Sequence, residues 1–146
     1  MATTTTQIRG TSDTALTTEL NSLANNARAA KASALTLTSA GYLLGECELK
    51  VTFGTAPTAN TGISCWFCRE IDGTNYEDGF DASLTPARAP DVVFPIRAVT
   101  TAQRIIVPCI IPPGGFYPMI LNDGTGQAFA ASANTLKIRP VTLQQA

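Results

Sequence analysis

The chain of 146 residues contains no histidine, and charged residues make up only 14% of it. Histidine is the commonest general base, so Ser, Thr and Cys nucleophiles lack their usual partner. The ten Lys and Arg residues are scattered singly and form no basic stripe, which disfavours nucleic-acid binding by phosphate neutralisation. We therefore expect a protein that is not an enzyme, holds no cofactor and does not bind nucleic acid.

Long apolar runs are missing as well. The longest, residues 105–113, is interrupted by Pro108, whereas a membrane helix needs about 18 or more apolar residues. The first residues have neither the basic nor the apolar region of a secretory signal, so we expect folding in a reducing cytoplasm, away from any membrane. Free, buried thiols are then the expected state of Cys47, Cys65, Cys68 and Cys109.

The length suits one domain with a single substantial core. Soluble domains usually carry about 25% charged residues, so this surface is thinly charged. Coverage by other subunits explains such a surface. A neutral surface rich in Thr, Ser, Asn and Ala is the alternative, and the sequence also supplies these residues.

Alternation of apolar and polar residues predicts an all-β protein. The clearest case is residues 46–54, where Cys47, Leu49, Val51 and Phe53 alternate with polar side chains. Similar segments bounded by turn residues lie at 33–44, 63–71, 92–99, 103–111, 116–121 and 136–139. About eight strands at such spacing predict an antiparallel β-sandwich or jelly roll. We expect the last two of these strands to pair with each other.

Three prolines, Pro95, Pro108 and Pro118, fall inside predicted strands. Proline cannot donate a hydrogen bond to a neighbouring strand, so Pro95 and Pro108 indicate edge strands or bulges.

The two ends of the chain suggest less regular structure. Residues 1–11 are polar and of low complexity, which predicts a flexible N-terminal arm. Over residues 12–32, apolar side chains recur at helical spacing and predict one short helix after the cap Ser12-Asp13. The β-sandwich domain would then span residues 33–140, followed by a C-terminal tail at 141–146.

The cysteine spacing Cys65-x-x-Cys68 is a weak indication of a metal or redox site. On a strand, residues three apart point to opposite faces, and no second closely spaced pair is present. We therefore assign no metal site. A disulfide between Cys47 and Cys65, across neighbouring strands, remains open if the protein meets an oxidant after leaving the cell.

Four aromatic residues carry an alternative function. They could form a sugar-binding face, because aromatic rings stack on the apolar faces of sugars, or they could simply pack in the core. These residues are Trp66, Tyr76, Phe80 and Tyr117.

Several segments resemble small bacteriophage and prophage virion proteins. The segments that carry the resemblance are TELNSLAN (18–25), VTFGTAPT (51–58), DGTNY (72–76), FPIRAVTTAQR (94–104), PPG (112–114) and TGQAFAAS (125–132). The resemblance extends from about residue 18 to residue 139 and consists of turns and strand pairs. It implies a non-enzymatic capsid decoration or cement protein, made in the host bacterial cytoplasm and located in the virion. The cysteines depart from the resemblance, notably Cys65 and Cys68, because plain apolar residues would serve at these two positions.

The resemblance implies binding to the major capsid protein and to copies of the chain itself, as a trimer or dimer. For these contacts we predict residues of the N-terminal arm and of the predicted helix, namely Thr3, Thr4, Thr5, Thr6, Ile8, Leu16, Leu20 and Leu23. A tail, neck or fibre component and a carbohydrate-binding module remain as alternatives.

Overall fold

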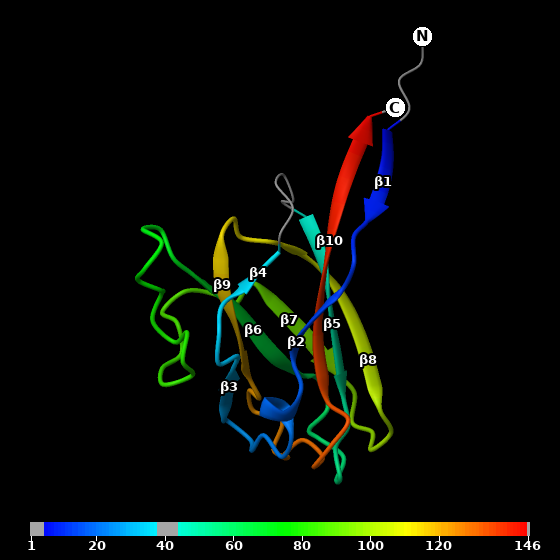
Figure 1. The fold of residues 1–146 in the computed structure, drawn as a ribbon. Coiled ribbons are helices and arrows are strands. Elements are labelled where there is room, and N and C mark those ends of the chain that lie inside the picture. Colours follow the sequence, from blue (N-terminus) through cyan, green and yellow to red (C-terminus); the bar gives the residue numbers. More distant parts are fainter. Residues whose placement is uncertain (1–4, 38–43, 146) are drawn as a thin grey trace.

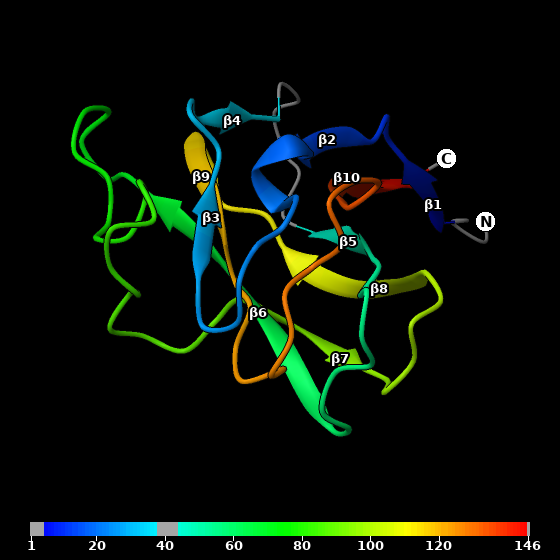
Figure 2. The same cartoon turned by 90° about the horizontal axis from the view of Figure 1, so that it is seen from below.

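The computed structural model describes residues 5–37 and 44–145, which form two antiparallel sheets packed face to face (Figures 1 and 2). In sheet A the strand order is β1-β10-β5-β8, and β2 pairs with β10 along the same edge as β1. In sheet B the strand order is β3-β9-β6-β7, and β4 pairs with β9 along the same edge as β3. The predicted all-β sandwich is thus confirmed. The strands are β1 (Thr5–Arg9), β2 (Asp13–Leu16), β3 (Arg28–Ala30), β4 (Leu35–Thr36), β5 (Leu44–Val51), β6 (Thr61–Arg69), β7 (Val92–Ile96), β8 (Gln103–Ile110), β9 (Gly115–Leu121) and β10 (Thr135–Gln145).

The core lies between the two sheets, and the alternation of β5 explains how sheet A contributes to it. Leu49 and Val51 are fully buried there, whereas Glu48 and Lys50 point outward. Sheet B differs, because six consecutive residues of β6, 63–68, are buried. Such a run requires cover on both faces of the sheet. A second apolar cluster, around Trp66 and Met119, provides that cover on the outer face of sheet B.

The prolines explain where pairing stops. Pro95 lies in β7 and Pro108 in β8, and these strands form one edge of sheet B and of sheet A respectively, as predicted. Pro118 and Pro140 lie in the interior strands β9 and β10. Opposite Pro118 the neighbouring edge is interrupted between β3 and β4, and opposite Pro140 it is interrupted between β1 and β2. Each break falls where the interior strand has no N–H to donate.

The predicted helix at 12–32 is wrong. Those residues form β2, the three-residue 3₁₀ helix η1 (Thr18–Leu20) and β3. Ser22 and Asn26 have positive φ angles of 57° and 61°, which interrupt any helix. The side-chain amide of Asn122, buried and distant in sequence, donates to the carbonyls of Leu23 and Ala24 at 3.1 Å each. Tertiary hydrogen bonds therefore replace helical ones. Within the described residues, no helix is long and apolar enough to cross a membrane.

Both predicted tails join the sheet. β1 pairs with the end of β10, from Thr5 opposite Gln145 to Arg9 opposite Val141, and this pair extends beyond the body of the sandwich in Figure 1. A flexible arm over residues 5–9 and a separate tail over 141–145 are thus incorrect. Residues 1–4 and 146 lie outside the described part. The expected pairing of β9 with β10 is also wrong, because they belong to different sheets.

Candidate functional site

The structure divides the predicted contact residues into two groups. Leu16, Leu20 and Leu23 are buried in the core of their own chain, with at most 8% exposure, so their assignment to contacts between subunits is wrong. Thr6 and Ile8 lie exposed on β1, where a neighbour can reach them. Thr5 belongs to the same strand, and Thr3 and Thr4 lie outside the described residues.

The outer face of sheet A carries an apolar stripe that the sequence analysis did not single out. Ile106 and Ile110 on β8 are 55% and 64% exposed, and Leu44, which pairs with Ile110 across the sheet, is 45% exposed. Alternation along β8 was the signal for this stripe, because residues at even positions from 104 to 110 point away from the core.

Ion pairs lie beside this apolar stripe. Glu46 on β5 contacts Arg139 at 2.5 Å and Arg9 at 3.4 Å, and Glu48 contacts Arg104 at 2.7 Å. Three arginines meet two glutamates in these pairs, so the five side chains together carry one excess positive charge. A partner that covers this face therefore meets apolar side chains and paired charges.

The outer face of sheet B is instead partly covered by the chain itself, over β6 and β9. The segment between β6 and β7, green in Figure 1, folds back over Trp66, Cys68 and Met119, all nearly inaccessible to solvent. Arg28 of β3 helps to hold this segment by donating hydrogen bonds to the carbonyls of Ala82 and Ser83, at 3.0 and 3.1 Å.

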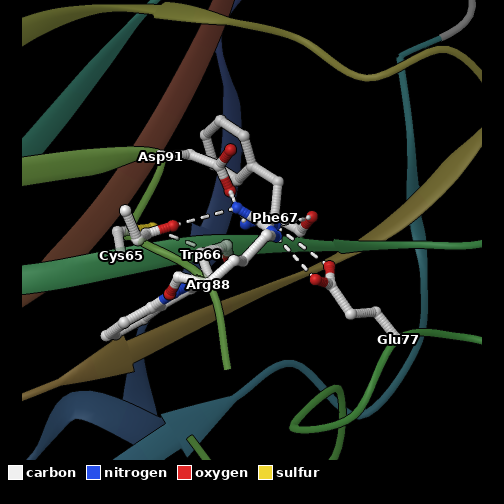
Figure 3. Close-up of polar contacts among 7 residues, drawn as sticks. Cys65, Trp66, Phe67, Glu77, Arg88 and Asp91 are labelled. Carbon is white, nitrogen blue, oxygen red and sulfur yellow. Dashed lines mark hydrogen bonds and ion pairs between the residues drawn. The ribbon is translucent and has the colours of Figure 1, made fainter. Parts of the chain in front are cut away.

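Three of the four aromatic residues from the sequence analysis form one cluster, in which Tyr76 and Phe80 of this segment pack against Tyr117 of β9. The Tyr76 ring centroid lies 4.7 Å from that of Tyr117 and 5.9 Å from that of Phe80. Trp66 is only 4% exposed, and its indole N–H donates to the carbonyl of Arg88 at 3.0 Å (Figure 3). Trp66 is therefore a packing residue, whereas Tyr76 is partly exposed.

Arg88 is the centre of a polar network on this face (Figure 3). Its guanidinium donates two hydrogen bonds to Glu77, at 2.6 and 3.0 Å, and one to the carbonyl of Phe67 at 3.1 Å. It also forms an ion pair with Asp91 at 2.9 Å, and Asp91 accepts a hydrogen bond from the Phe67 N–H at 2.7 Å. The network thus ties the covering segment to the middle of β6.

Electrostatics keep this network charged. The hydrogen bonds from Arg88 lower the pKa of Glu77 below its ordinary value, and those to Glu77 raise the pKa of Arg88 further. Glu77 is therefore ionised at neutral pH and already engaged. A carboxylate whose pKa lies below its ordinary value is a weak base, so Glu77 is poorly suited to proton transfer at neutral pH.

A groove lies beside the network, where β6 ends and the covering segment begins. Its volume is about 580 Å³. It is lined by Arg69, Glu70, Ile71, Asn75, Tyr76, Glu77, Arg88 and Pro113. Six of the eight lining residues lie in the stretch 69–77, and Arg88 and Pro113 come from two other segments; Tyr76 is the one that the sequence had indicated as a candidate sugar-stacking ring.

The four cysteines are free and buried. Cys65 faces the core and Cys68 faces the outer cluster of sheet B, as expected for residues three apart on a strand. Cys47 and Cys65 do not lie on neighbouring strands, the arrangement expected for a disulfide between them, because β5 and β6 belong to different sheets; both thiols are free, and Cys47 Sγ lies 3.5 Å from Cys109 Sγ.

Thiol chemistry is suppressed by the surroundings. Burial raises the pKa of Cys68 to about 12 and also raises that of Cys65, while the contact with Cys109 raises the pKa of Cys47. Thiolate, the reactive and metal-binding form, is therefore scarce at neutral pH. Among the residues that the structure describes, no group of three or more Cys, Asp or Glu residues is arranged to hold a metal ion.

Comparisons with protein-family models, with curated proteins and with solved structures found no match to this chain.

Proposed function

We propose that this protein is a non-enzymatic structural component of a bacteriophage virion, of the capsid decoration or cement type. It binds the major capsid protein and copies of itself, as a trimer or dimer. The observation that carries the proposal is the outer face of sheet A, where Leu44, Ile106 and Ile110 form an exposed apolar stripe that no other segment among residues 5–37 and 44–145 covers.

The contrast between the two sheets supports this assignment. The chain covers part of the outer face of sheet B, over β6 and β9, with its own residues 70–91, whereas isoleucines remain exposed on sheet A. Exposed apolar patches rimmed by polar residues are typical of interaction surfaces. Burial contributes about 25 cal/mol per Å² of apolar surface, so a modest contact repeated over a shell becomes large in sum.

The pair formed by β1 and the end of β10 supplies a second contact surface. Isolated two-stranded pairs are only marginally stable in water, so packing against a neighbour would stabilise the part that extends beyond the sandwich. Thr6 and Ile8 are exposed there. Thr6 and Ile8 thus stay in the proposed contact surface, as predicted from the sequence. The stripe on sheet A takes the place of the three leucines at 16, 20 and 23, which are buried.

Copy number and position in purified particles test the proposal. Quantitative mass spectrometry, combined with cryo-electron microscopy of the same sample, should find many copies spread over the shell. A few copies at the tail or at one vertex would contradict a decoration role and would favour a tail, neck or fibre component. Absence from the particle would refute both assignments.

Variants test the surface itself. Ile106→Thr combined with Ile110→Thr keeps β-branched side chains on the strand but removes apolar surface. We expect this variant to fold normally and to bind particles that lack the protein at least about 10-fold more weakly, a change of about 1.4 kcal/mol. The control is Val93→Thr, because Val93 is 48% exposed on β7 of the other sheet. Equal binding by both variants would exclude the stripe as the contact.

A further inference from the structure

We propose that the groove between the end of β6 and residues 70–77 binds a neutral saccharide. This inference goes beyond the proposed structural role and does not depend on it, because the groove lies on sheet B and the proposed contact stripe on sheet A. A volume of about 580 Å³ lies within the usual range for small-ligand sites, which is about 300–1,000 Å³.

The charges that line the groove argue for an uncharged ligand. Two guanidinium groups, Arg69 and Arg88, are matched by two carboxylates, Glu70 and Glu77. A strongly anionic or cationic ligand would be attracted by two of these side chains and repelled by the other two. A polyhydroxylated ligand suits such a lining, because each hydroxyl both donates and accepts hydrogen bonds, and the groove offers donors, acceptors and the Asn75 amide.

An aromatic ring and an exposed apolar side chain complete the lining. Tyr76 is held by Tyr117 and Phe80 on the protein side and remains partly exposed toward the groove. Ile71, at the rim, is fully exposed. Sugars present C–H surfaces as well as hydroxyls, so a lining with both an aromatic ring and hydrogen-bonding groups matches both parts of the ligand.

The lining is organised before any ligand binds. Glu77 is held by Arg88, and the Asn75 side-chain amide donates to Asp72 at 2.7 Å. The backbone of Glu70 pairs with that of Tyr76 in an isolated β-bridge. Groups that are already positioned lose less entropy when a ligand binds, which favours affinity.

Gly115 allows the Tyr76 ring to take this position. A Cβ atom on Gly115 would lie 2.9 Å from the Tyr76 hydroxyl oxygen, closer than a side chain tolerates. The Pro-Pro-Gly-Gly turn at 112–115 therefore helps to shape the groove, and Pro113 is one of its walls.

Ligand-observed NMR on the isolated full chain tests the proposal. The probes are three neutral trisaccharides, maltotriose, cellotriose and triacetylchitotriose, with sialyllactose as the anionic comparison. At up to about 10 mM, where a site with a millimolar Kd is mostly filled, we expect saturation transfer to at least one neutral trisaccharide. Transfer to none of them, or to sialyllactose alone, would overturn the proposal.

Variants then locate the site. Arg69→Ala removes an exposed side chain from the groove, and Tyr76→Ala removes the ring; we expect each to weaken binding of the responding trisaccharide at least about 10-fold. Arg69→Ala keeps the test decisive if Tyr76→Ala does not fold, because Arg69 packs little against the core. The matched control is Arg97→Ala, just after the end of β7, where the sheet register places it at the opposite end of β6 from Arg69. Binding that survives Arg69→Ala, or that falls equally with Arg97→Ala, would refute the assignment to this groove.

Discussion

Replacement of Arg88 by alanine should loosen the segment that covers sheet B. The change removes two hydrogen bonds to Glu77, one to the Phe67 carbonyl and the ion pair with Asp91. Hydrogen bonds to charged groups contribute about 1.5–3 kcal/mol each, but these are not additive, and the Arg88 side chain is 28% exposed to screening solvent. We therefore expect a loss of about 2–3 kcal/mol in the free energy of unfolding.

Urea denaturation followed by tryptophan fluorescence measures this loss. With a slope of about 2 kcal/mol per M, the midpoint should fall by about 1 M or slightly more. The single Trp66 lies under the network, because its indole N–H donates to the Arg88 carbonyl, and its emission reports the same region. Limited proteolysis should also show new cleavage within residues 70–91.

Arg104→Ala is the matched control. Arg104 also forms an ion pair, with Glu48 at 2.7 Å, but its side chain is 57% exposed on sheet A. Exposed pairs contribute at most about 1 kcal/mol. If Arg88→Ala shifts the urea midpoint no more than Arg104→Ala does, and cleavage in residues 70–91 is unchanged, the anchoring role assigned to Arg88 is refuted.

The effect of Arg88→Ala should depend on pH. The folded-state pKa of Glu77 is lowered from the ordinary value of 4.5 by its hydrogen bonds with Arg88. A lowered carboxyl pKa contributes stability that is fully present above the unfolded-state pKa and is lost as pH falls through the folded-state pKa. The difference in stability between the wild type and Arg88→Ala should therefore be largest at neutral pH and shrink below pH 4.5. A difference that grows on acidification would contradict this linkage.

Three further predictions concern the core. Asn122→Ala should lower the free energy of unfolding by about 2–3 kcal/mol, because it removes the donor from three carbonyls; the hydrogen bond to that of Leu23 is buried, and those to Ala24 and Gln127 are partly buried. Thermal melts should show this, while exposed Asp123→Ala stays near the wild type. Leu20→Ala should cost about 3 kcal/mol in urea melts, as expected for a fully buried leucine, and an unchanged midpoint would place Leu20 outside the core. The four thiols should resist iodoacetamide at pH 8 in the native protein because all four are buried, and burial also raises the pKa of Cys68 to about 12. All four should react in denaturant. Mass spectrometry counts the adducts, and rapid native labelling would contradict this burial.

Much of the sheet structure was predictable because strand signals are local. Alternation placed Leu49 and Val51 in the core, and the prolines Pro95 and Pro108 correctly indicated edge strands. The spacing of Cys65 and Cys68 placed them on opposite faces of β6, as observed. Each of these inferences depends on one strand and its own backbone geometry.

The N-terminal region shows where local signals fail. Leu16, Leu20 and Leu23 have helical spacing, yet the segment is not helical. The carbonyl of Leu23 accepts hydrogen bonds from the Asn122 side-chain amide and the Phe129 N–H, about a hundred residues later, instead of from a helical neighbour. The same spacing led to their assignment as contact residues, although all three are buried. Hydrogen-bond donors so distant in sequence produce no periodic pattern within the segment, so the sequence of the segment alone could not indicate them.

By itself, the sequence determined the all-β class, most strand positions, the edge prolines and the lack of a histidine-based catalytic site. Only the tertiary structure decided which sheet each strand joins, that residues 5–9 pair with residues 141–145, and that residues 70–91 pack over β6 and β9 of sheet B while Ile106 and Ile110 of sheet A stay exposed. It also brought Arg69, Tyr76 and Arg88 around one groove. The physical reason is that alternation records which side of a strand is buried, whereas the choice of neighbour depends on long-range packing and hydrogen bonds.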